Sequence, residues 1–170
     1  LKLSTAWIFL GGSPSTGMTT DRAIDHVTIA GADLDDLRET FERAGFEPTY
    51  GGAHSNGITH MASIGFEDRS YIELVSKLNT KSDETSPWWD AQIDTDAGAS
   101  AWAVPSEAIA EETARLRDGG LRVDGPERFH RERPDGERIE WELTSFGAGP
   151  QGGAYPTFII DHTPLERRVS

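Results

Sequence analysis

The chain of 170 residues has 29 acidic and 16 basic residues, a formal net charge of −13, and no cysteine. The acidic balance argues against a nucleic-acid partner, because neutralising phosphates requires clustered Lys and Arg. The lack of cysteine excludes a disulfide framework, thiol catalysis and thiolate metal sites, and favours an intracellular, cytoplasmic location. No apolar run approaches the roughly 20 residues that span a bilayer, so we expect no membrane segment.

The first residues differ in character from those that follow. Their apolar part, AWIFL, is shorter than the roughly 7–15 residues of a signal-peptide core. The next stretch, GGSPSTG, is typical of a flexible linker. We therefore expect residues 1–22 to be a partly disordered N-terminal extension, followed by a single domain over 23–165 and a tail over 166–170.

The domain opens with RAIDHVTIAG, residues 22–31, which predicts a β-strand with a histidine in its middle. Strand side chains alternate between two faces, so His26 shares a face with Ile24 and Thr28. Asp25 directly precedes this histidine. A histidine in a strand is more often a hydrogen-bonded structural residue than a ligand, so its role depends on its surroundings.

The remainder of the first half predicts one helix and three more strands. Leu34, Leu37 and Phe41 recur on one helical face, and Asp33 precedes them as an N-cap. Alternating apolar residues then predict strands, which gives the order β-α-β-β-β over residues 23–78. The expected elements are a helix over 34–44 and strands over 47–52, 57–66 and 70–76.

A polar connector over 79–98 leads to a second half in which the same order recurs over 99–165. A shift of 75 residues places Leu34 on Ile109, and the glycine that ends the first helix on the glycine that ends the second. With the same shift, the strands expected in the first half align with strands expected in the second half. Agreement at several structural levels predicts a tandem duplication.

This layout resembles the glyoxalase-like domain family of the vicinal-oxygen-chelate superfamily, which includes glyoxalase I, extradiol dioxygenases and bleomycin-resistance proteins. The stretches that carry the resemblance are IDHVTIAGADLDDLRETFERAGF, GGAHSNGITHMASIGFEDRSYIEL and ERPDGERIEWEL…PTFIID. The resemblance implies an α+β fold of two tandem βαβββ modules, forming a cupped, half-closed mixed β-sheet with helices on the outer face. It specifies no single activity, since one fold hosts many.

The resemblance also implies a divalent metal in the cup. The usual ligands are a His or Gln on the first strand and a Glu on the fourth strand of each module. Carried over by position, these are His26 and Glu73 in the first module. An imidazole nitrogen and a carboxylate oxygen suit Zn, Fe, Mn, Ni or Co. Glu73 is in addition the candidate catalytic base.

The second module departs from this pattern. The position equivalent to His26 is Ala101, which cannot bind a metal, and the counterpart of Glu73 is Ile160, or Asp161 if the register differs by one. We therefore expect His60, on the third strand, to be the third metal ligand. The candidate substrate-binding residues are His54 at the rim, Tyr71, Trp102 and Asp161.

Two main functions follow. The pair of His26 and Glu73 favours a metal-dependent enzyme of lyase, isomerase or dioxygenase type that acts on a small oxygen-bearing metabolite. Ala101 favours a metal-free module that binds a small molecule or sequesters a drug in the same cup. A scaffold or dimerisation unit is a third class, because modules of this fold often pair between chains, and a homodimer is therefore an additional expectation.

Overall fold

The computed structural model describes residues 22–80, 83–86, 88–96, 98–148 and 153–169. The expected N-terminal extension lies outside the described residues except for Arg22, as do parts of the 79–98 connector and the last residue of the expected tail. Residues 166–168 of that tail belong instead to a short helix that packs onto the domain.

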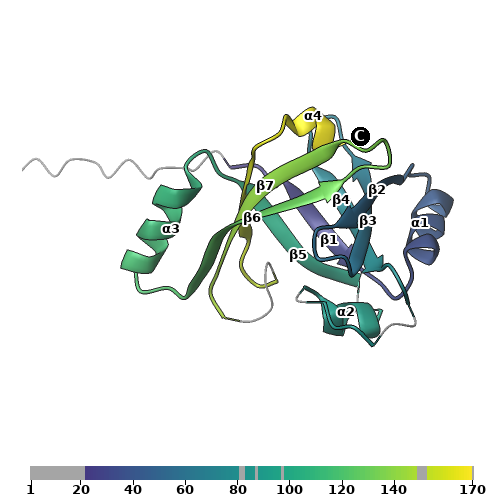
Figure 1. Cartoon of the computed structure of the whole chain (residues 1–170), viewed down its shortest axis with the longest axis horizontal. Helices are drawn as coiled ribbons and strands as arrows, with labels where there is room; N and C mark the ends of the chain where they lie inside the picture. The colour runs from purple at the N-terminus through teal and green to yellow at the C-terminus, as the bar shows by residue number, and fades with distance from the viewer. Residues whose placement is uncertain (1–21, 81–82, 87, 97, 149–152, 170) are drawn as a thin grey trace, which may run out of the picture.

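Each half of the chain folds as a βαβββ module (Figure 1). The first contains β1 (His26–Ala30), α1 (Leu34–Arg43), β2 (Thr49–His54), β3 (Thr59–Gly65) and β4 (Tyr71–Lys77). The second contains β5 (Gly98–Pro105), α3 (Ile109–Asp118), β6 (Val123–Glu132), β7 (Arg138–Phe146) and β8 (Thr157–Asp161). Helix α2 (Asp90–Asp94) lies in the connector, and α4 (Leu165–Arg168) follows β8. Helices α1 and α3 begin 75 residues apart, as the duplication predicts.

The eight strands form one mixed sheet in the order β1-β4-β3-β2-β6-β7-β8-β5, which closes on itself where β5 pairs with β1. The β1–β4 and β5–β8 pairs are parallel and the others are antiparallel. The modules also meet between β2 and β6, where only Ala53↔Glu132 and His54↔Arg131 are paired. This short seam closes the cup into a barrel, and the predicted α+β fold is confirmed.

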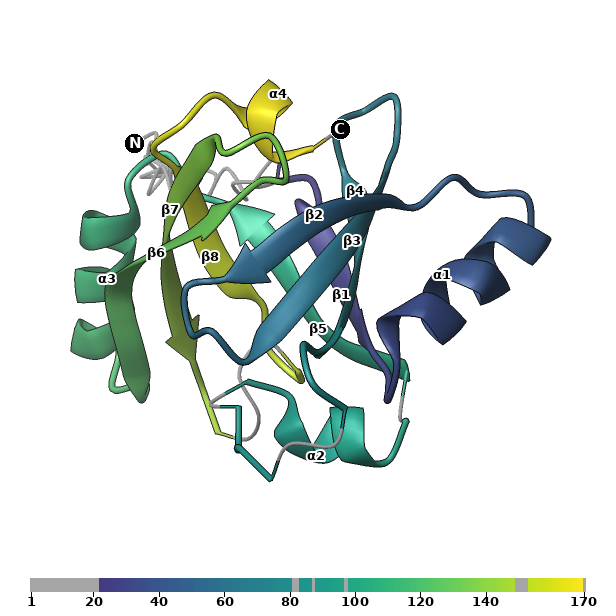
Figure 2. The same ribbon diagram turned by 45° about the vertical axis from the view of Figure 1, so that its right-hand side comes forward.

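The long helices cover the outside of the barrel (Figure 2). Helix α1 packs through Leu34 on Ala62, Ile64 and Leu74 of β3 and β4, while α3 packs on the strands of the second module. Helices α2 and α4 lie at opposite ends of the barrel (Figure 2). Among the described helices, none is long and apolar enough to cross a membrane. Because α1 and α3 pack on the outside of the barrel, a candidate binding site can lie inside it.

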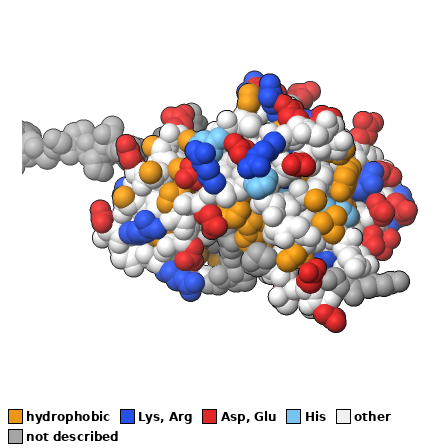
Figure 3. Space-filling view, viewed as in Figure 1, with side chains coloured by type: hydrophobic (Ala, Val, Ile, Leu, Met, Phe, Trp, Pro, Cys, Tyr) orange, Lys and Arg blue, Asp and Glu red, His pale blue; other side chains and the backbone are white. Residues whose placement is uncertain are grey.

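Charged side chains of both signs are mixed on the surface. On the face drawn in Figure 3, the Lys and Arg side chains lie among Asp and Glu rather than in one continuous basic patch. A formal net charge of −13 on the whole chain repels a polyanion.

Candidate functional site

A narrow cavity lies inside the barrel, between the two modules. The space open to the centres of water molecules is about 60 Å³, several times the ~10–15 Å³ that one water needs. Its polar lining includes His26, Thr28, His54, Glu73, Arg131 and Arg168. Its apolar lining includes Met61, Trp88, Trp89, Trp102, Trp141 and Leu143. A small cavity with a few convergent polar groups and aromatic walls is typical of a small-molecule site.

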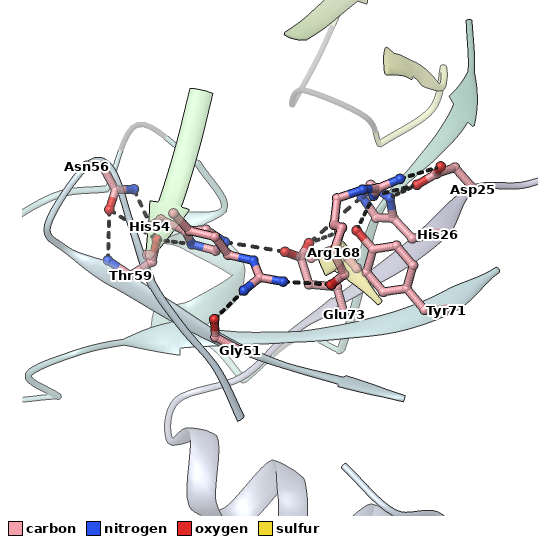
Figure 4. A network of polar contacts seen from close by, with 11 residues as sticks. Asp25, His26, Gly51, His54, Asn56, Thr59, Tyr71, Glu73 and Arg168 are labelled. Carbon is pink, nitrogen blue, oxygen red and sulfur yellow. Dashed lines mark hydrogen bonds and ion pairs between the residues drawn. The ribbon is translucent and has the colours of Figure 1, made fainter. Parts of the chain in front are cut away.

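Glu73 is the residue on which the polar groups converge (Figure 4). It is only 7 % exposed, and Thr28 Oγ1 donates a hydrogen bond of 2.9 Å to its Oε2. His54 Nε2 lies 3.4 Å from Oε1, and His26 Nε2 lies 3.9 Å from Oε2. Two imidazole nitrogens from different strands therefore approach the two oxygens of one buried carboxylate.

The electrostatics of this group keep Glu73 ionised. Burial alone would raise its pKa, but the hydrogen bond with His54, the charge of His26 and the hydrogen bond from Thr28 outweigh burial and lower the pKa to about 2. A metal ligand must be deprotonated, whereas a general base is most effective with a pKa near the working pH. The low pKa therefore suits Glu73 to a ligand role better than to the role of base.

The ring of His26 is held from two sides. Its Nδ1 lies 2.6 Å from Asp25 Oδ1, and the ring stacks on Tyr71 at 4.7 Å between centroids. Burial raises the pKa of Asp25, but the hydrogen bonds with His26 and Arg168 and the Arg168 charge hold it well below its usual range. Because the ionised carboxylate only accepts, Nδ1 of His26 donates, and Nε2 is the nitrogen that faces Glu73.

His54 has a similar support from the turn between β2 and β3. Its Nδ1 lies 2.8 Å from Thr59 Oγ1, and Asn56 Nδ2 donates to the same hydroxyl at 3.0 Å. The Asn56 side chain also accepts from the backbone N–H groups of Ile58 and Thr59, which fixes the turn. The sequence placed His54 at the rim, and the structure places it beside Glu73.

The structure places His60, the expected third metal ligand, away from this group. Side chains alternate along β3: Met61 lines the cavity, while Ala62 and Ile64 pack on the side of α1. His60 lies on that outer side, half-buried, with its ring edge-on to Tyr50 at 5.8 Å. The sheet itself separates His60 from Glu73.

Two of the other predicted site residues line the cavity and one does not. Tyr71 and Trp102 are part of its wall. Asp161 lies outside the described cavity lining and forms an ion pair with Arg168, with Oδ1 2.6 Å from Nε. The role of Asp161 in the structure is therefore to bind this arginine.

The second module contributes no counterpart to His26 and Glu73. The parallel pairing Thr28↔Glu73 in the first module corresponds, after the 75-residue shift, to Ala103↔Thr157 in the second. The equivalent of Glu73 is thus Thr157 rather than Ile160 or Asp161. Ala101 and Thr157 both line the cavity. At these two positions, the second module therefore has no imidazole or carboxylate group.

Sequence reasoning missed several contributors to the cavity, among them Arg131, Trp88 and Arg168. Arg131 on β6 donates to the backbone carbonyls of Gly51 and Arg168. Trp88, in the connector, lies edge-on to His54 at 6.1 Å between centroids. The alternation of β6 offers a weak signal for Arg131, whereas Trp88 and Arg168 reach the cavity only through the tertiary fold.

The described residues form a closed cup of two βαβββ modules, with His26 on β1 and Glu73 on β4. Residues 24–169 match the model of a family described as "Glyoxalase-like domain", and the chain belongs to this family. Comparison with curated protein sequences finds no match.

Solved structures share the fold at low sequence identity. A hypothetical protein from Staphylococcus aureus is 20 % identical with a TM-score of 0.67, and the match covers 85 % of this chain and 61 % of that one. Methylmalonyl-CoA epimerase from Mycobacterium tuberculosis is 20 % identical with a TM-score of 0.53, covering 81 % and 85 %. The Streptomyces coelicolor epimerase, solved in complex with 2-nitronate-propionyl-CoA, is 23 % identical with a TM-score of 0.50, covering 81 % and 92 %. This chain thus spans about three fifths of the staphylococcal protein, and these likenesses establish the fold.

The residues in the cup fit a divalent metal by chemistry. Within the described part of the chain, no three His, Asp or Glu side chains form a ready-made metal cluster. The donor types are nevertheless those that Zn, Fe, Mn, Ni and Co prefer: the Nε2 atoms of two histidines and an ionised carboxylate. Asp25 and Thr59 bind the remaining nitrogens of His26 and His54, as outer partners of metal-bound histidines do.

Proposed function

We propose that the cup is the active site of a divalent-metal-dependent enzyme, of lyase, isomerase or dioxygenase type, that acts on a small oxygen-bearing metabolite. His26, His54 and Glu73 would hold the metal, so His54 replaces His60 in the ligand set. The observation that carries the proposal is the approach of His54 Nε2 and His26 Nε2 to the Glu73 carboxylate, at 3.4 and 3.9 Å.

A bound metal would supply Lewis acidity toward substrate oxygens. The chain's own residues account for the rest of the site. Asp25 and Thr59 orient the two imidazoles, Thr28 fixes one oxygen of Glu73, and aromatic side chains form part of the cavity wall. The small volume of the cavity favours a metabolite of a few heavy atoms, or the reacting end of a longer one.

A second candidate is a metal-free module that binds a small molecule in the same cup. The observation in its favour is the second module, where Ala101 and Thr157 occupy the positions at which donors are expected. In this alternative, His26, His54 and Glu73 form a polar patch in a cavity with aromatic walls. Metal content separates the two candidates.

The test is the metal content of untagged protein after exposure to Fe, Mn, Ni, Co and Zn, measured by elemental mass spectrometry. We expect about one metal ion per chain in the wild type and loss of metal in His26→Ala and His54→Ala. His60→Ala is the matched control, since this histidine lies on the other side of the sheet, and it should retain the metal. Absence of metal in the wild type at every loading would select the metal-free module.

A further inference from the structure

Helix α4 carries an arginine that is buried at one end of the barrel. Arg168 is 3 % exposed, although a charged side chain is seldom buried unless it is paired. Its Nη1 and Nη2 donate to the two oxygens of Asp25 at 2.9 and 2.8 Å, and its Nε lies 2.6 Å from Asp161 Oδ1. Nη1 also donates to Tyr71 Oη at 2.7 Å, and the guanidinium lies 5.2 Å from the centre of the Tyr71 ring.

Two of these partners are also the supports of the His26 ring (Figure 4). Asp25 Oδ1, which accepts from Arg168, is the atom that lies 2.6 Å from His26 Nδ1. Tyr71, which accepts from Arg168 through its hydroxyl, stacks on the same imidazole at 4.7 Å. A single guanidinium therefore fixes both the hydrogen-bond acceptor and the stacking partner of His26.

The backbone of Arg168 is tied to the cup as well. Its carbonyl accepts a hydrogen bond of 2.7 Å from Arg131 Nη2, and Arg131 in turn donates to Gly51 on β2. Arg69, in the turn before β4, forms an ion pair of 3.1 Å with Glu166 of α4. These contacts hold the short helix in place, and Arg168 is directed inward by them.

We propose that Arg168 is a positioning residue of the site, which sets the tautomer and orientation of His26 through Asp25 and Tyr71. A planar, bidentate guanidinium aligns the Asp25 carboxylate with the His26 Nδ1–H group. The imidazole is thereby left with Nε2 directed into the cavity. The effect on metal affinity rests on the proposed function, whereas the effect on the His26 ring does not.

The test compares Arg168→Lys with the wild type in the metal-free protein, by the ¹⁵N chemical shifts of His26 in long-range ¹H–¹⁵N spectra. The wild type should show the proton on Nδ1, and Arg168→Lys should show a mixture of tautomers, because an ammonium cannot bind Asp25 in bidentate fashion. Arg167→Lys, on the exposed face of the same helix, is the matched control and should leave the shifts unchanged. Asp161→Asn removes a different partner of Arg168, so it should lower stability and spare the His26 tautomer.

Titration with Co(II) or Zn(II) completes the experiment. We expect Arg168→Lys to weaken metal binding by about 10- to 100-fold, the usual effect of losing an outer-shell partner, and Arg167→Lys to leave it unchanged.

A changed tautomer in a protein that binds no metal would uphold the role of Arg168 and refute the metal-dependent function. Unchanged tautomer and unchanged affinity in Arg168→Lys would overturn the role of Arg168 alone. If this variant does not fold, Asp25→Ala removes the acceptor that Arg168 aligns with His26 Nδ1–H, and an unaltered His26 tautomer there would overturn the role of this contact.

Discussion

His54 Nε2 lies 3.4 Å from Glu73 Oε1, although the two residues stand on β2 and β4 with β3 between them. The contact forms because the inner face of β3 presents Met61, and both polar side chains extend into the cavity on either side of it. Thr59, the first residue of β3, then holds the imidazole in place. The site depends on this cross-sheet geometry more than on neighbouring positions in the sequence.

We expect Thr59→Val to weaken metal binding by about 10- to 100-fold, because the Thr59 hydroxyl orients His54. The substitution keeps the shape of the buried side chain but leaves two polar groups, His54 Nδ1 and Asn56 Nδ2, without their partner. The free energy of unfolding should fall by about 1–3 kcal/mol. Urea titration measures the stability, and metal titration measures the affinity.

Thr59→Ser is the control for this prediction, since it retains the hydroxyl and should keep metal affinity near the wild-type value. A destabilised Thr59→Val protein with wild-type metal affinity would contradict the assignment of His54 as a ligand.

Glu73 should make stability depend on pH in the acid range. Its pKa is lowered from an ordinary value of 4.5 to about 2 in the folded protein. The stabilisation from this shift is fully present above pH 4.5 and is lost as the pH falls through the folded pKa. Between pH 6 and pH 3, the wild type should lose about 2 kcal/mol more than Glu73→Gln in free energy of unfolding.

Urea denaturation of both proteins at several pH values measures this difference. Glu42→Gln alters an exposed carboxylate on α1 and should lose stability in parallel with the wild type. Parallel curves for the wild type and Glu73→Gln would show that the Glu73 carboxylate is not held by its two histidines.

The fold could be predicted because the βαβββ pattern occurs twice in the sequence. The 75-residue shift placed α1 and α3 correctly, and the glycines that end them, Gly45 and Gly120, both have positive φ, of 92° and 78°. Alternation along β1 likewise placed His26 and Thr28 on the same side, and both line the cavity. Local periodicity was sufficient for these features.

The position of His54 beside Glu73 could not be predicted in this way. Both sides of β3 are buried, one by the cavity and the other by α1, so the sequence of this strand has no polar face that identifies the inside. Alternation therefore grouped His60 with Ala62 and Ile64 correctly but did not say which side of the sheet they face. Arg168 was beyond prediction for a different reason, since its partner Asp25 lies 143 residues away.

Gly52→Ala should destabilise the protein more than Gly57→Ala, because Gly52 lies against β6 where β2 and β6 close the cup. Both glycines have positive φ, of 104° and 68°, so both variants incur backbone strain. A Cβ at position 52 would lie 2.1 Å from the backbone oxygen of Glu132, whereas one at position 57 would meet no atom within 4 Å. Gly57→Ala should cost about 1–2 kcal/mol, and Gly52→Ala about 2–3 kcal/mol more through the clash.

The difference in free energy of unfolding between these two variants measures the cost of disturbing the β2–β6 contact. In this contact, two residue pairs are in register. Because His54 is one of the paired residues, separation of the strands should displace it from Glu73 and reduce metal binding in Gly52→Ala. Gly57→Ala leaves the seam intact and should bind metal like the wild type. Thermal unfolding and metal titration check both effects. Equal loss of stability in the two variants would show that β6 moves aside freely and that the cup does not need a closed seam.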